Sequence, residues 1–245
     1  MCVLVLLRNP LPDWPVVVAA NRDEFRARPS EGPQILDRCA LAGRDLQGGG
    51  TWLGVSRDAT VVAITNRRTP PRSDSHSRGR LVMDALLARS WEGRPTGGYN
   101  LLIASPRAQV AWEYDGEERM RILRSDLHVI SSHRDVDDPD APDGLAVRRL
   151  LRLPSAAFPD HPVPGGTAKG GPCRGIDELR SHLREVQSSH DGDVCKHGDA
   201  YGTVSACFVA LHRTGLRASQ FWCAEGQPCA DVWTDRSDLL RQIAG

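Results

Sequence analysis

The sequence predicts an α+β fold in which two packed antiparallel β-sheets are covered by helices on each side. Short apolar runs with the character of strands occupy both halves of the chain. Helical periodicity appears in three separate stretches between them, and most connections have hairpin length. Strands and helices grouped in this order are typical of layered sheets. A chain of 245 residues is long enough for one substantial core, and we expect a single domain over residues 1–245.

The first expected element is an N-terminal hairpin. Apolar runs at residues 2–7 and 16–20 flank a turn-rich stretch that contains three prolines. Folding the hairpin about residues 11 and 12 places Cys2 nearly opposite Asn21. Because strand side chains alternate, Asp23 then shares the face of Cys2, and Arg22 points to the other face.

The remaining elements follow from periodicity and turn signals. Further strands are expected at residues 51–56, 60–66, 99–104, 109–114, 119–123, 127–131, 205–211, 217–223 and 230–234. Helices are expected at residues 78–89, 142–153 and 175–186, and the last has an apolar stripe at positions 176, 179, 183 and 186. Residues 154–172 are expected to form an excursion loop. Glycines 48–50 indicate a tight turn near Cys2, because no P-loop lysine follows them.

Cys2 is the first candidate for chemistry. If Met1 is removed, this residue presents a thiol and a free α-amino group, with ordinary pKa values of about 8.5 and about 7.7 to 8.0. The amine can then take the proton of the thiol, so nucleophile and base belong to one residue. The alternative is a buried cysteine that packs at the start of a strand.

Several short blocks occur in an order that is characteristic of one family. They are Met1-Cys2, Asn-Arg-Asp-Glu-Phe at 21–25, Gly-Thr-Trp-Leu-Gly-Val at 50–55, Thr-Asn-Arg-Arg at 65–68, Gly-Tyr-Asn-Leu-Leu at 98–102, and Cys-Lys-His at 195–197 before Tyr-Gly-Thr-Val-Ser-Ala at 201–206. With these blocks the chain resembles the NRDE family, also called the transport and Golgi organization protein 2 family, over nearly its whole length. Their joint order makes the signal specific.

The resemblance implies a fold and a site. The NRDE family is distantly similar to N-terminal nucleophile hydrolases of the choloylglycine hydrolase and penicillin V acylase type, which have a four-layer αββα sandwich. Carried over, Cys2 matches the nucleophile, Asp23 the acid that orients the amine, and Asn66 an oxyanion donor. Two positions depart from that pattern. An arginine expected three residues before the acid is Ala20, and a second asparagine is Ser132.

Four further residues are candidates for substrate binding, namely Asn21, Arg22, Arg67 and Ser132. Guanidinium groups suit bidentate contacts with a carboxylate or propionate, although surface salt bridges are an equal alternative for arginine.

Composition excludes several classes of partner. Lys plus Arg equals Asp plus Glu at 31 each, so no global basic field favours nucleic acid or an anionic membrane. No apolar stretch approaches the roughly 20 residues of a membrane span, and the N-terminus lacks the basic region of a signal peptide. We therefore expect a soluble cytoplasmic protein that binds a small molecule; the oligomeric state stays open.

The seven cysteines do not form a disulfide framework or a recognisable metal motif. Their spacing is irregular, and no CxxC pair occurs. The nearest approach to a ligand cluster is Cys195-x-His197 with His190 upstream, whereas zinc requires four ligands. We expect no metal, and we interpret the remaining cysteines as packing or surface thiols. They are Cys39, Cys173, Cys207, Cys223 and Cys229.

Two functions of different classes follow. The first is an N-terminal cysteine amidohydrolase without a cofactor, which acts on a C–N bond of a small amide. The second is a non-catalytic carrier, since members of the NRDE family have been linked to haem trafficking and lipid handling, and the departures at Ala20 and Ser132 suit a pocket without turnover. An enzyme of this type requires removal of Met1, whereas a carrier does not.

Overall fold

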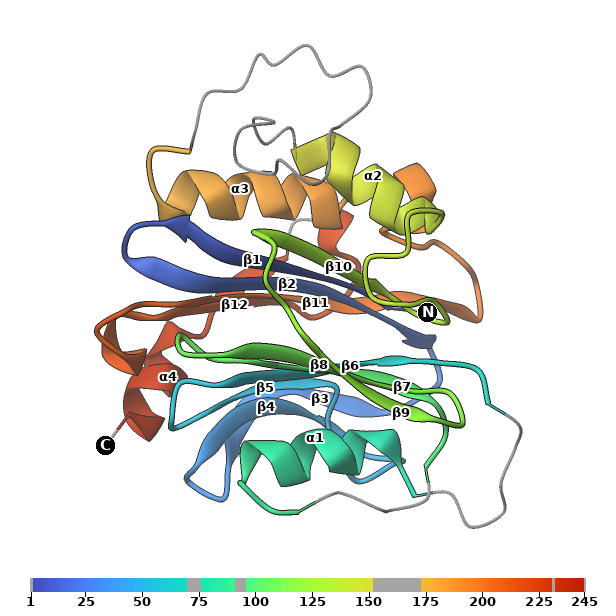
Figure 1. Cartoon of the computed structure of the whole chain (residues 1–245), viewed down its shortest axis with the longest axis horizontal. Helices are drawn as coiled ribbons and strands as arrows, with labels where there is room; N and C mark the ends of the chain where they lie inside the picture. Colours follow the sequence, from blue (N-terminus) through green and yellow to red (C-terminus); the bar gives the residue numbers. More distant parts are fainter. Residues whose placement is uncertain (1, 70–75, 91–95, 152–172, 231, 245) are drawn as a thin grey trace.

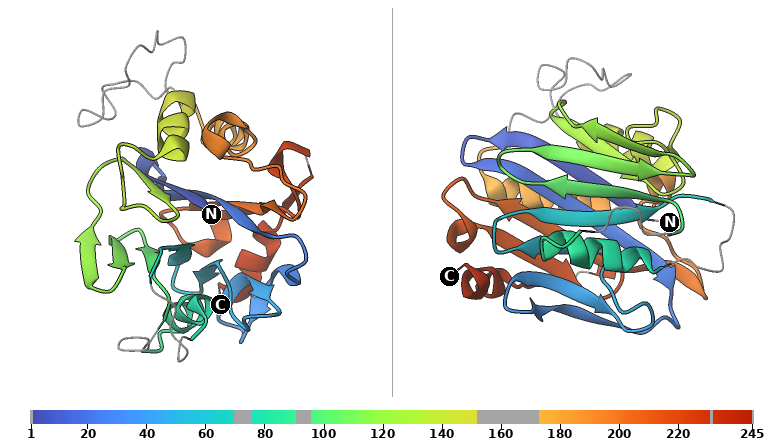
Figure 2. Two further views of the ribbon diagram at one scale, coloured as in Figure 1. Left: turned by 90° about the vertical axis from the view of Figure 1, so that its right-hand side faces the viewer. Right: turned by 60° about the horizontal axis from the view of Figure 1, so that its bottom comes forward.

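The chain forms a four-layer αββα sandwich (Figure 1). The computed structural model describes residues 2–69, 76–90, 96–151, 173–230 and 232–244. Helices α2 (Pro142–Leu151) and α3 (Ile176–Gln187) cover one sheet, and α1 (Arg78–Leu86) covers the other. Figure 2 shows the same layers after a quarter turn, with the two sheets face to face between the helices. The predicted layer arrangement is confirmed.

The first sheet has six strands in the order β10-β1-β2-β11-β12-β13. Their bounds are β10 Leu127–Ser131, β1 Val3–Leu11, β2 Trp14–Phe25, β11 Tyr201–Leu211, β12 Gln220–Ala224 and β13 Trp233–Asp235. All the neighbouring pairs are antiparallel. The N-terminal hairpin therefore lies in the middle of this sheet, flanked by strands from much later in the chain.

The second sheet has seven strands in the order β3-β4-β5-β6-β7-β8-β9 and is an antiparallel meander. Their bounds are β3 Ser30–Leu36, β4 Ala40–Asp45, β5 Leu53–Ser56, β6 Val61–Asn66, β7 Tyr99–Ala104, β8 Gln109–Tyr114 and β9 Glu118–Ile122. Helix α1 interrupts the meander between β6 and β7 and packs back on β5 and β6.

Alternation along the strands divides the core. In β1, Leu4 and Leu6 face the other sheet, where they pack with β6 and β7, whereas Val3 and Val5 face α2 and α3. The C-terminal helix α4 (Ser237–Ile243) closes one edge of the inter-sheet core through Leu240, which is fully buried. Each sheet thus buries both faces, which explains the near-continuous apolar runs of its central strands.

The register of the N-terminal hairpin differs from the prediction. Val3 pairs with Asn21, so Cys2 lies opposite Arg22 and not opposite Asn21. The tight turn lies at residues 12 and 13, since Leu11 pairs with Trp14, and the register shifts between Arg8 and Leu11 where Asn9 adopts a φ of 49°. This β-bulge shifts the pairing of the polar end of β2 with Cys2 by one residue. A hairpin without a bulge has no such shift in its pairing.

Most other elements agree with expectation, with three omissions, although β11 begins four residues before its predicted start, β13 begins three residues after its own, and α1 ends three residues early. Strands β7, β8 and β10 have the predicted bounds, and the helices begin within one residue of the predicted starts. Strands β3 and β4 and helix α4 were not predicted. The expected strand at 217–223 begins instead with a 3₁₀ turn at Leu216–Ala218. The excursion loop at 154–172 and the end of the helix predicted to reach residue 153 lie outside the described residues.

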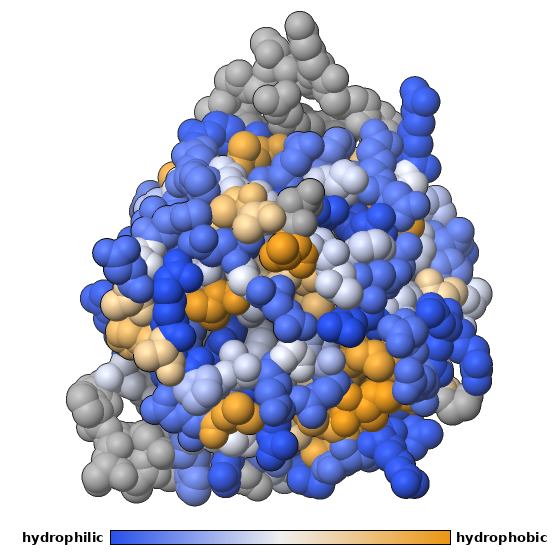
Figure 3. All heavy atoms as spheres, turned by 180° about the vertical axis from the view of Figure 1, so that it is seen from behind, coloured by the Kyte–Doolittle hydropathy of each residue, from blue (hydrophilic) through white to orange (hydrophobic). Residues whose placement is uncertain are grey.

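Among the residues that the structure describes, few large apolar side chains are exposed. On the face opposite that of Figure 1, apolar side chains form a few small groups among hydrophilic ones (Figure 3). Among the helices that the structure describes, none is long and apolar enough to cross a membrane.

Candidate active site

A cavity of about 650 Å³ opens where β2 and β6 end and α1 begins. Cys2 and Asp23 line it from the first sheet, and Trp52 and Asn66 line it from the second. Arg78, the first residue of α1, adds a charged side chain from a third element. The structure therefore brings the three predicted catalytic residues, Cys2, Asp23 and Asn66, to one cavity.

Cys2 is held against Ser132 at the end of β10. The Cys2 backbone N–H donates to Ser132 Oγ at 2.6 Å, and the Ser132 N–H donates to the Cys2 carbonyl at 3.0 Å. Ser132 Oγ also donates to that carbonyl at 3.2 Å. Ser132 is 3% exposed, so this hydroxyl is committed to positioning Cys2. The residue that replaces the expected asparagine thus contacts the nitrogen that becomes the α-amine when Met1 is removed.

Cys2 is half-buried, and its thiol lies beside Asp23. Its Sγ lies 3.9 Å from the Asp23 carbonyl oxygen. Burial raises the pKa of the Cys2 thiol, and the negative charge of Asp23 raises it further. In the chain that retains Met1, this cysteine is therefore a protonated thiol at neutral pH.

Asp23 has one satisfied oxygen and one open one. Thr203 Oγ1 donates to Asp23 Oδ1 at 2.7 Å, whereas the buried Oδ2 has no hydrogen-bond partner among the described residues. Lys196 Nζ lies 3.4 Å from Oδ2, at ion-pair distance. Burial raises the pKa of Asp23, and the Thr203 hydrogen bond and the Lys196 charge offset only part of that effect. Oδ2 is thus paired in charge with Lys196 but accepts no hydrogen bond among the described residues, so it can accept one from a further donor.

Arg22 lies on the Cys2 side of the strand, which corrects the predicted orientation. It pairs opposite Cys2, and both line the cavity. Beside it, the β2–β11 register shifts between Thr203 and Ser205, and such a bulge increases the local twist. The Arg22 guanidinium stacks on Trp52 at 4.2 Å and donates to Ser30 Oγ at 3.2 Å. Arg22 supplies positive charge beside the thiol. The resemblance places an arginine at position 20 instead, where this chain has alanine.

Asn21 does not take part in the cavity. Its side chain is 1% exposed on the helix side of the sheet, where Nδ2 donates to the carbonyls of Gln187 and Val194 at 2.8 Å each. The proposed substrate-binding role of Asn21 is therefore not supported by the geometry, because the one-residue shift in register turns it away from Cys2. It ties the segment after α3 to the central strand β2.

Arg67 is largely occupied by carboxylates of the protein itself. It reaches the cavity, but its guanidinium lies within 2.6 Å of both Asp115 and Asp135 and 3.4 Å from Glu113. Glu113 is buried, so this network fixes the end of β6 against β8. We assign Arg67 a structural role and not the substrate contact expected from the sequence.

Two positively charged residues of the cavity were not singled out from the sequence. Arg28 pairs with Asp45 at 2.7 Å, and Arg78 donates to the Gly98 carbonyl at 3.2 Å. Burial lowers the pKa of Arg78, although its guanidinium stays charged at neutral pH. Their charge was visible in the sequence, but no local signal places them near Cys2.

The glycine turn approaches the same cavity, as predicted. Gly49 has a φ of 66°, and a Cβ on Gly50 would lie 2.2 Å from the carbonyl carbon of Gly79 in α1. Gly48 lines the cavity. These glycines let α1 pack close enough to deliver Arg78 to the site.

Two solved structures are similar to this chain. A Caenorhabditis elegans N-acylethanolamine-hydrolyzing acid amidase ortholog has a TM-score of 0.47 and 8% identity, over 84% of this chain and 92% of that chain. The C2A mutant of a conjugated bile acid hydrolase from Clostridium perfringens has a TM-score of 0.42 and 10% identity, over 92% of this chain and 89% of that chain. Both TM-scores lie below 0.5, and we draw no inference from them.

Comparison of the sequence with known proteins shows the family to which the chain belongs. The mouse Transport and Golgi organization 2 homolog is 35% identical over 124 residues, which are 42% of this chain and 45% of the mouse protein. The bovine homolog is 33% identical over 129 residues, 44% of this chain and 47% of its own length. The chain thus spans less than half of the length of these relatives. The family described as Transport and Golgi organisation 2 matches residues 1–142, which is more than half of the chain, and the chain belongs to this family.

Proposed function

We propose that the chain, after removal of Met1, is an N-terminal cysteine amidohydrolase that cleaves a C–N bond of a small-molecule amide. The observation that carries the proposal is the surroundings of the Cys2 nitrogen. This atom is fixed by Ser132, and the buried carboxylate of Asp23, with an open oxygen, lies beside the same residue. Removal of Met1 converts the Cys2 amide nitrogen into an amine. This amine can donate a hydrogen bond to Asp23 Oδ2.

The reaction then needs no second base. The α-amine takes the thiol proton, and the thiolate attacks the amide carbonyl carbon of the substrate. The C–N bond breaks, the amine product leaves with a proton from the Cys2 ammonium group, and an acyl thioester remains on Sγ. Water, deprotonated by the same amine, hydrolyses the thioester to a carboxylic acid. Asn66 is placed on the opposite wall, where its amide can donate to the oxyanion.

The lining favours a substrate with an anionic group. Arg22 and Arg78 project into the cavity and are not held by carboxylates through any hydrogen bond or ion pair that the structure describes. Both are partly desolvated, which strengthens their attraction to an anion. A carboxylate or phosphate on the substrate can therefore be held while the amide lies at Cys2.

The carrier function is the second candidate. The arginines that suit a substrate anion suit the propionates of haem or the headgroup of a lipid equally well. A porphyrin or acyl chain also requires apolar walls, and Trp52 and Ile64 are the large apolar side chains among the described lining residues. The polar lining therefore favours the amidohydrolase.

The test combines turnover with haem binding. Untagged protein is incubated with a panel of N-acyl amides that carry a carboxylate, and amine release is measured for wild type, Cys2→Ala and the control Cys39→Ala. Cys39 is a free, half-buried thiol outside the cavity. Release that is lost only in Cys2→Ala supports the proposal. Saturable haem binding that requires Cys2, with no amine release across the panel, favours the carrier.

A further inference from the structure

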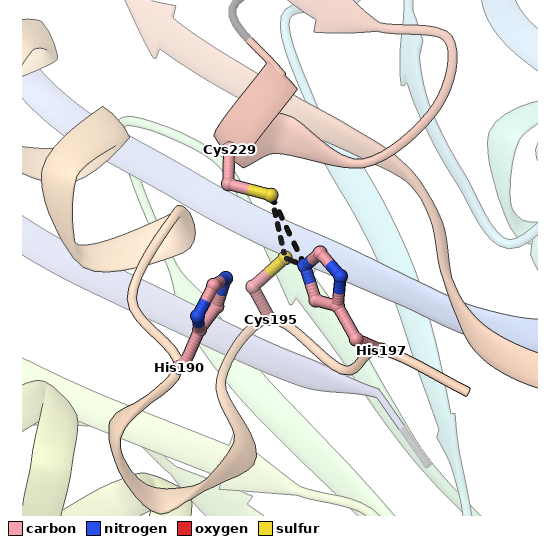
Figure 4. Close-up of side chains that lie close together, drawn as sticks. All are labelled: His190, Cys195, His197 and Cys229. Atoms are coloured by element: carbon pink, nitrogen blue, oxygen red, sulfur yellow. Dashed lines mark hydrogen bonds between the residues drawn. The ribbon is translucent and has the colours of Figure 1, made fainter.

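Four potential metal ligands converge outside the cavity of Cys2. They are His190, Cys195, His197 and Cys229, and their ligand atoms all lie within 4.8 Å of one another. Figure 4 shows that the first three come from the segment that follows α3 and that Cys229 comes from the 3₁₀ turn η4 (Pro228–Ala230). Two segments remote in sequence thus present two thiols and two imidazoles to one point.

The sequence alone did not reveal this cluster. His190, Cys195 and His197 gave three ligands without a recurring motif, and Cys229 is 32 residues beyond His197. The β11–β12 hairpin returns the chain so that η4 packs against α3 and β11, which brings in the fourth ligand. Our expectation of no metal rested on the absence of that ligand.

We propose that His190, Cys195, His197 and Cys229 bind one Zn²⁺ ion in a tetrahedral site. Two of the three distances among the ligand atoms of Cys195, His197 and Cys229 match the edges of such a site, and the third, between His197 and Cys229, is shorter by about 0.5 Å. Bonds of about 2.3 Å to sulfur and about 2.05 Å to nitrogen place two sulfurs about 3.8 Å apart, and a sulfur and a nitrogen about 3.6 Å apart. The two sulfurs lie 3.8 Å apart, and His197 Nε2 lies 3.7 Å from Cys195 Sγ and 3.1 Å from Cys229 Sγ.

The ligand set also fits zinc in charge and type. Two thiolates neutralise the two positive charges of the ion, and imidazole nitrogen with thiolate sulfur is a donor combination that zinc prefers. The rings of His190 and His197 lie 4.5 Å apart at 66°, so they do not stack face to face. A cavity of about 260 Å³ between α3 and η4 is lined by Cys229 and gives access from solvent.

The backbone around the cluster is already fixed. The Cys195 N–H donates to the Ser189 carbonyl at 2.8 Å, and the Lys196 N–H donates to Thr203 Oγ1 at 2.8 Å. Asn21 holds the carbonyl of Val194. Cys195 is buried, so its direction is set by packing and not by the metal. Such a preformed site loses less conformational entropy on binding than a flexible loop does.

The proposed zinc links two parts of the fold. It joins the segment at residues 190–197 to η4, and this segment carries Lys196 between two of the ligands. Lys196 extends to Asp23 on the other side. A bound ion therefore stabilises the position of Lys196, although binding of the metal itself does not depend on any hydrolytic activity.

A disulfide between Cys195 and Cys229 is the competing use of the same atoms. Their separation of 3.8 Å is well beyond a bond of about 2.05 Å, so both are thiols here. Oxidation would remove two ligands and abolish the site. The experiment therefore measures the oxidation state together with the metal.

The test uses untagged protein with the whole 245-residue sequence, because a histidine tag would bind zinc itself. Reduced protein is dialysed against Zn²⁺, and bound metal is counted by elemental analysis; a parallel sample is titrated with Co²⁺ and followed by absorbance. The variants are Cys229→Ser, His197→Asn and the control Cys173→Ser. Cys173 has a histidine neighbour, His182, at 3.5 Å but lies outside the cluster.

The proposal predicts one zinc per wild-type chain and a Co²⁺ spectrum with thiolate-to-cobalt charge transfer and tetrahedral d–d bands. Cys229→Ser and His197→Asn should weaken zinc binding by at least about tenfold while folding as judged by circular dichroism, and Cys173→Ser should bind like wild type. Three outcomes overturn the proposal. They are no zinc on the reduced protein, equal binding by all variants, and a Cys195–Cys229 disulfide that forms in the presence of Zn²⁺ and reductant.

Discussion

Replacement of Asp23 by asparagine separates catalysis from folding in this chain. The amide oxygen of Asn can accept the Thr203 hydroxyl, now 2.7 Å from Oδ1. Its NH₂ group then takes the place of Oδ2, which lies 3.4 Å from Lys196 Nζ and which, in the proposed site, accepts from the Cys2 amine. All three are donors, so the amine loses its carboxylate acceptor and keeps only Ser132 Oγ. We expect the rate of amide cleavage to fall at least about tenfold, or about 1.4 kcal/mol of barrier.

The same substitution is expected to leave the fold intact. Burial raises the folded-state pKa of Asp23 above its unfolded value. The contribution of such an acid to stability is fully present below the unfolded pKa and is lost as the pH rises through the folded pKa. At neutral pH the ionised carboxylate therefore destabilises the fold, and the neutral amide removes that effect. Because the amide also gives up the Lys196 ion pair, the melting temperature of Asp23→Asn should stay close to that of the wild type.

Kinetics and melting are measured on the same preparations. The initial rate of amine release at saturating and at limiting substrate gives kcat and kcat/KM, and differential scanning calorimetry at neutral pH gives the melting temperature. A fall in kcat with a melting temperature close to that of the wild type agrees with the proposed role. An unchanged kcat would refute the claim that Asp23 orients the amine.

Three further predictions follow from neighbouring groups. Asp137 accepts hydrogen bonds from His128 and the backbone, which hold its pKa below the ordinary value despite burial. Asp137→Asn should therefore destabilise the protein by about 1–2 kcal/mol in urea unfolding at neutral pH, and the difference should shrink as the pH falls below about 4 and be lost only as the pH falls through the lowered folded-state pKa. Ser132→Ala removes the acceptor of the Cys2 nitrogen and should lower kcat at least about fivefold while leaving the circular dichroism spectrum unchanged. Iodoacetamide should label Cys2 slowly at neutral pH in protein that retains Met1, because burial raises the thiol pKa, and faster once Met1 is removed; equal rates would contradict this explanation.

Much of the sandwich was predictable because apolar runs and turns are local signals. Strands β7, β8 and β10 are bounded by clear turn residues and have the predicted limits. Strand β3 was missed because it carries a glycine and a proline and lies half-buried or exposed at the edge of its sheet. The short helix α4 was missed because its seven residues give too few turns for a periodic pattern.

The site was predictable in its members but not in their orientation. The sequence blocks of the family predicted that Cys2, Asp23 and Asn66 belong to one site, and all three line the same cavity. Orientation depended on a bulge near Asn9, which reversed the expected positions of Asn21 and Arg22 relative to Cys2. A single inserted residue changes the face of every following side chain, and nothing in the local sequence marks it.

Contacts between segments remote in sequence were beyond sequence reasoning, although Ser132 itself was a candidate through the family resemblance. Ser132 reaches Cys2 through pairing between β1 and β10, which are separated by more than a hundred residues. Cys229 reaches Cys195 through a hairpin and a 3₁₀ turn. Such contacts depend on the packing of the whole sheet, and the amino-acid sequence alone does not indicate which remote residues will meet.

The intact mass of untagged protein, purified from the cells that made it, tests the central claim most directly. The proposed nucleophile and base exist together only when Cys2 is the first residue. The account predicts a mass lower than that of the full sequence by one methionine, and a single adduct on Cys2 after brief exposure to iodoacetamide near neutral pH. A population that uniformly retains Met1 would contradict it.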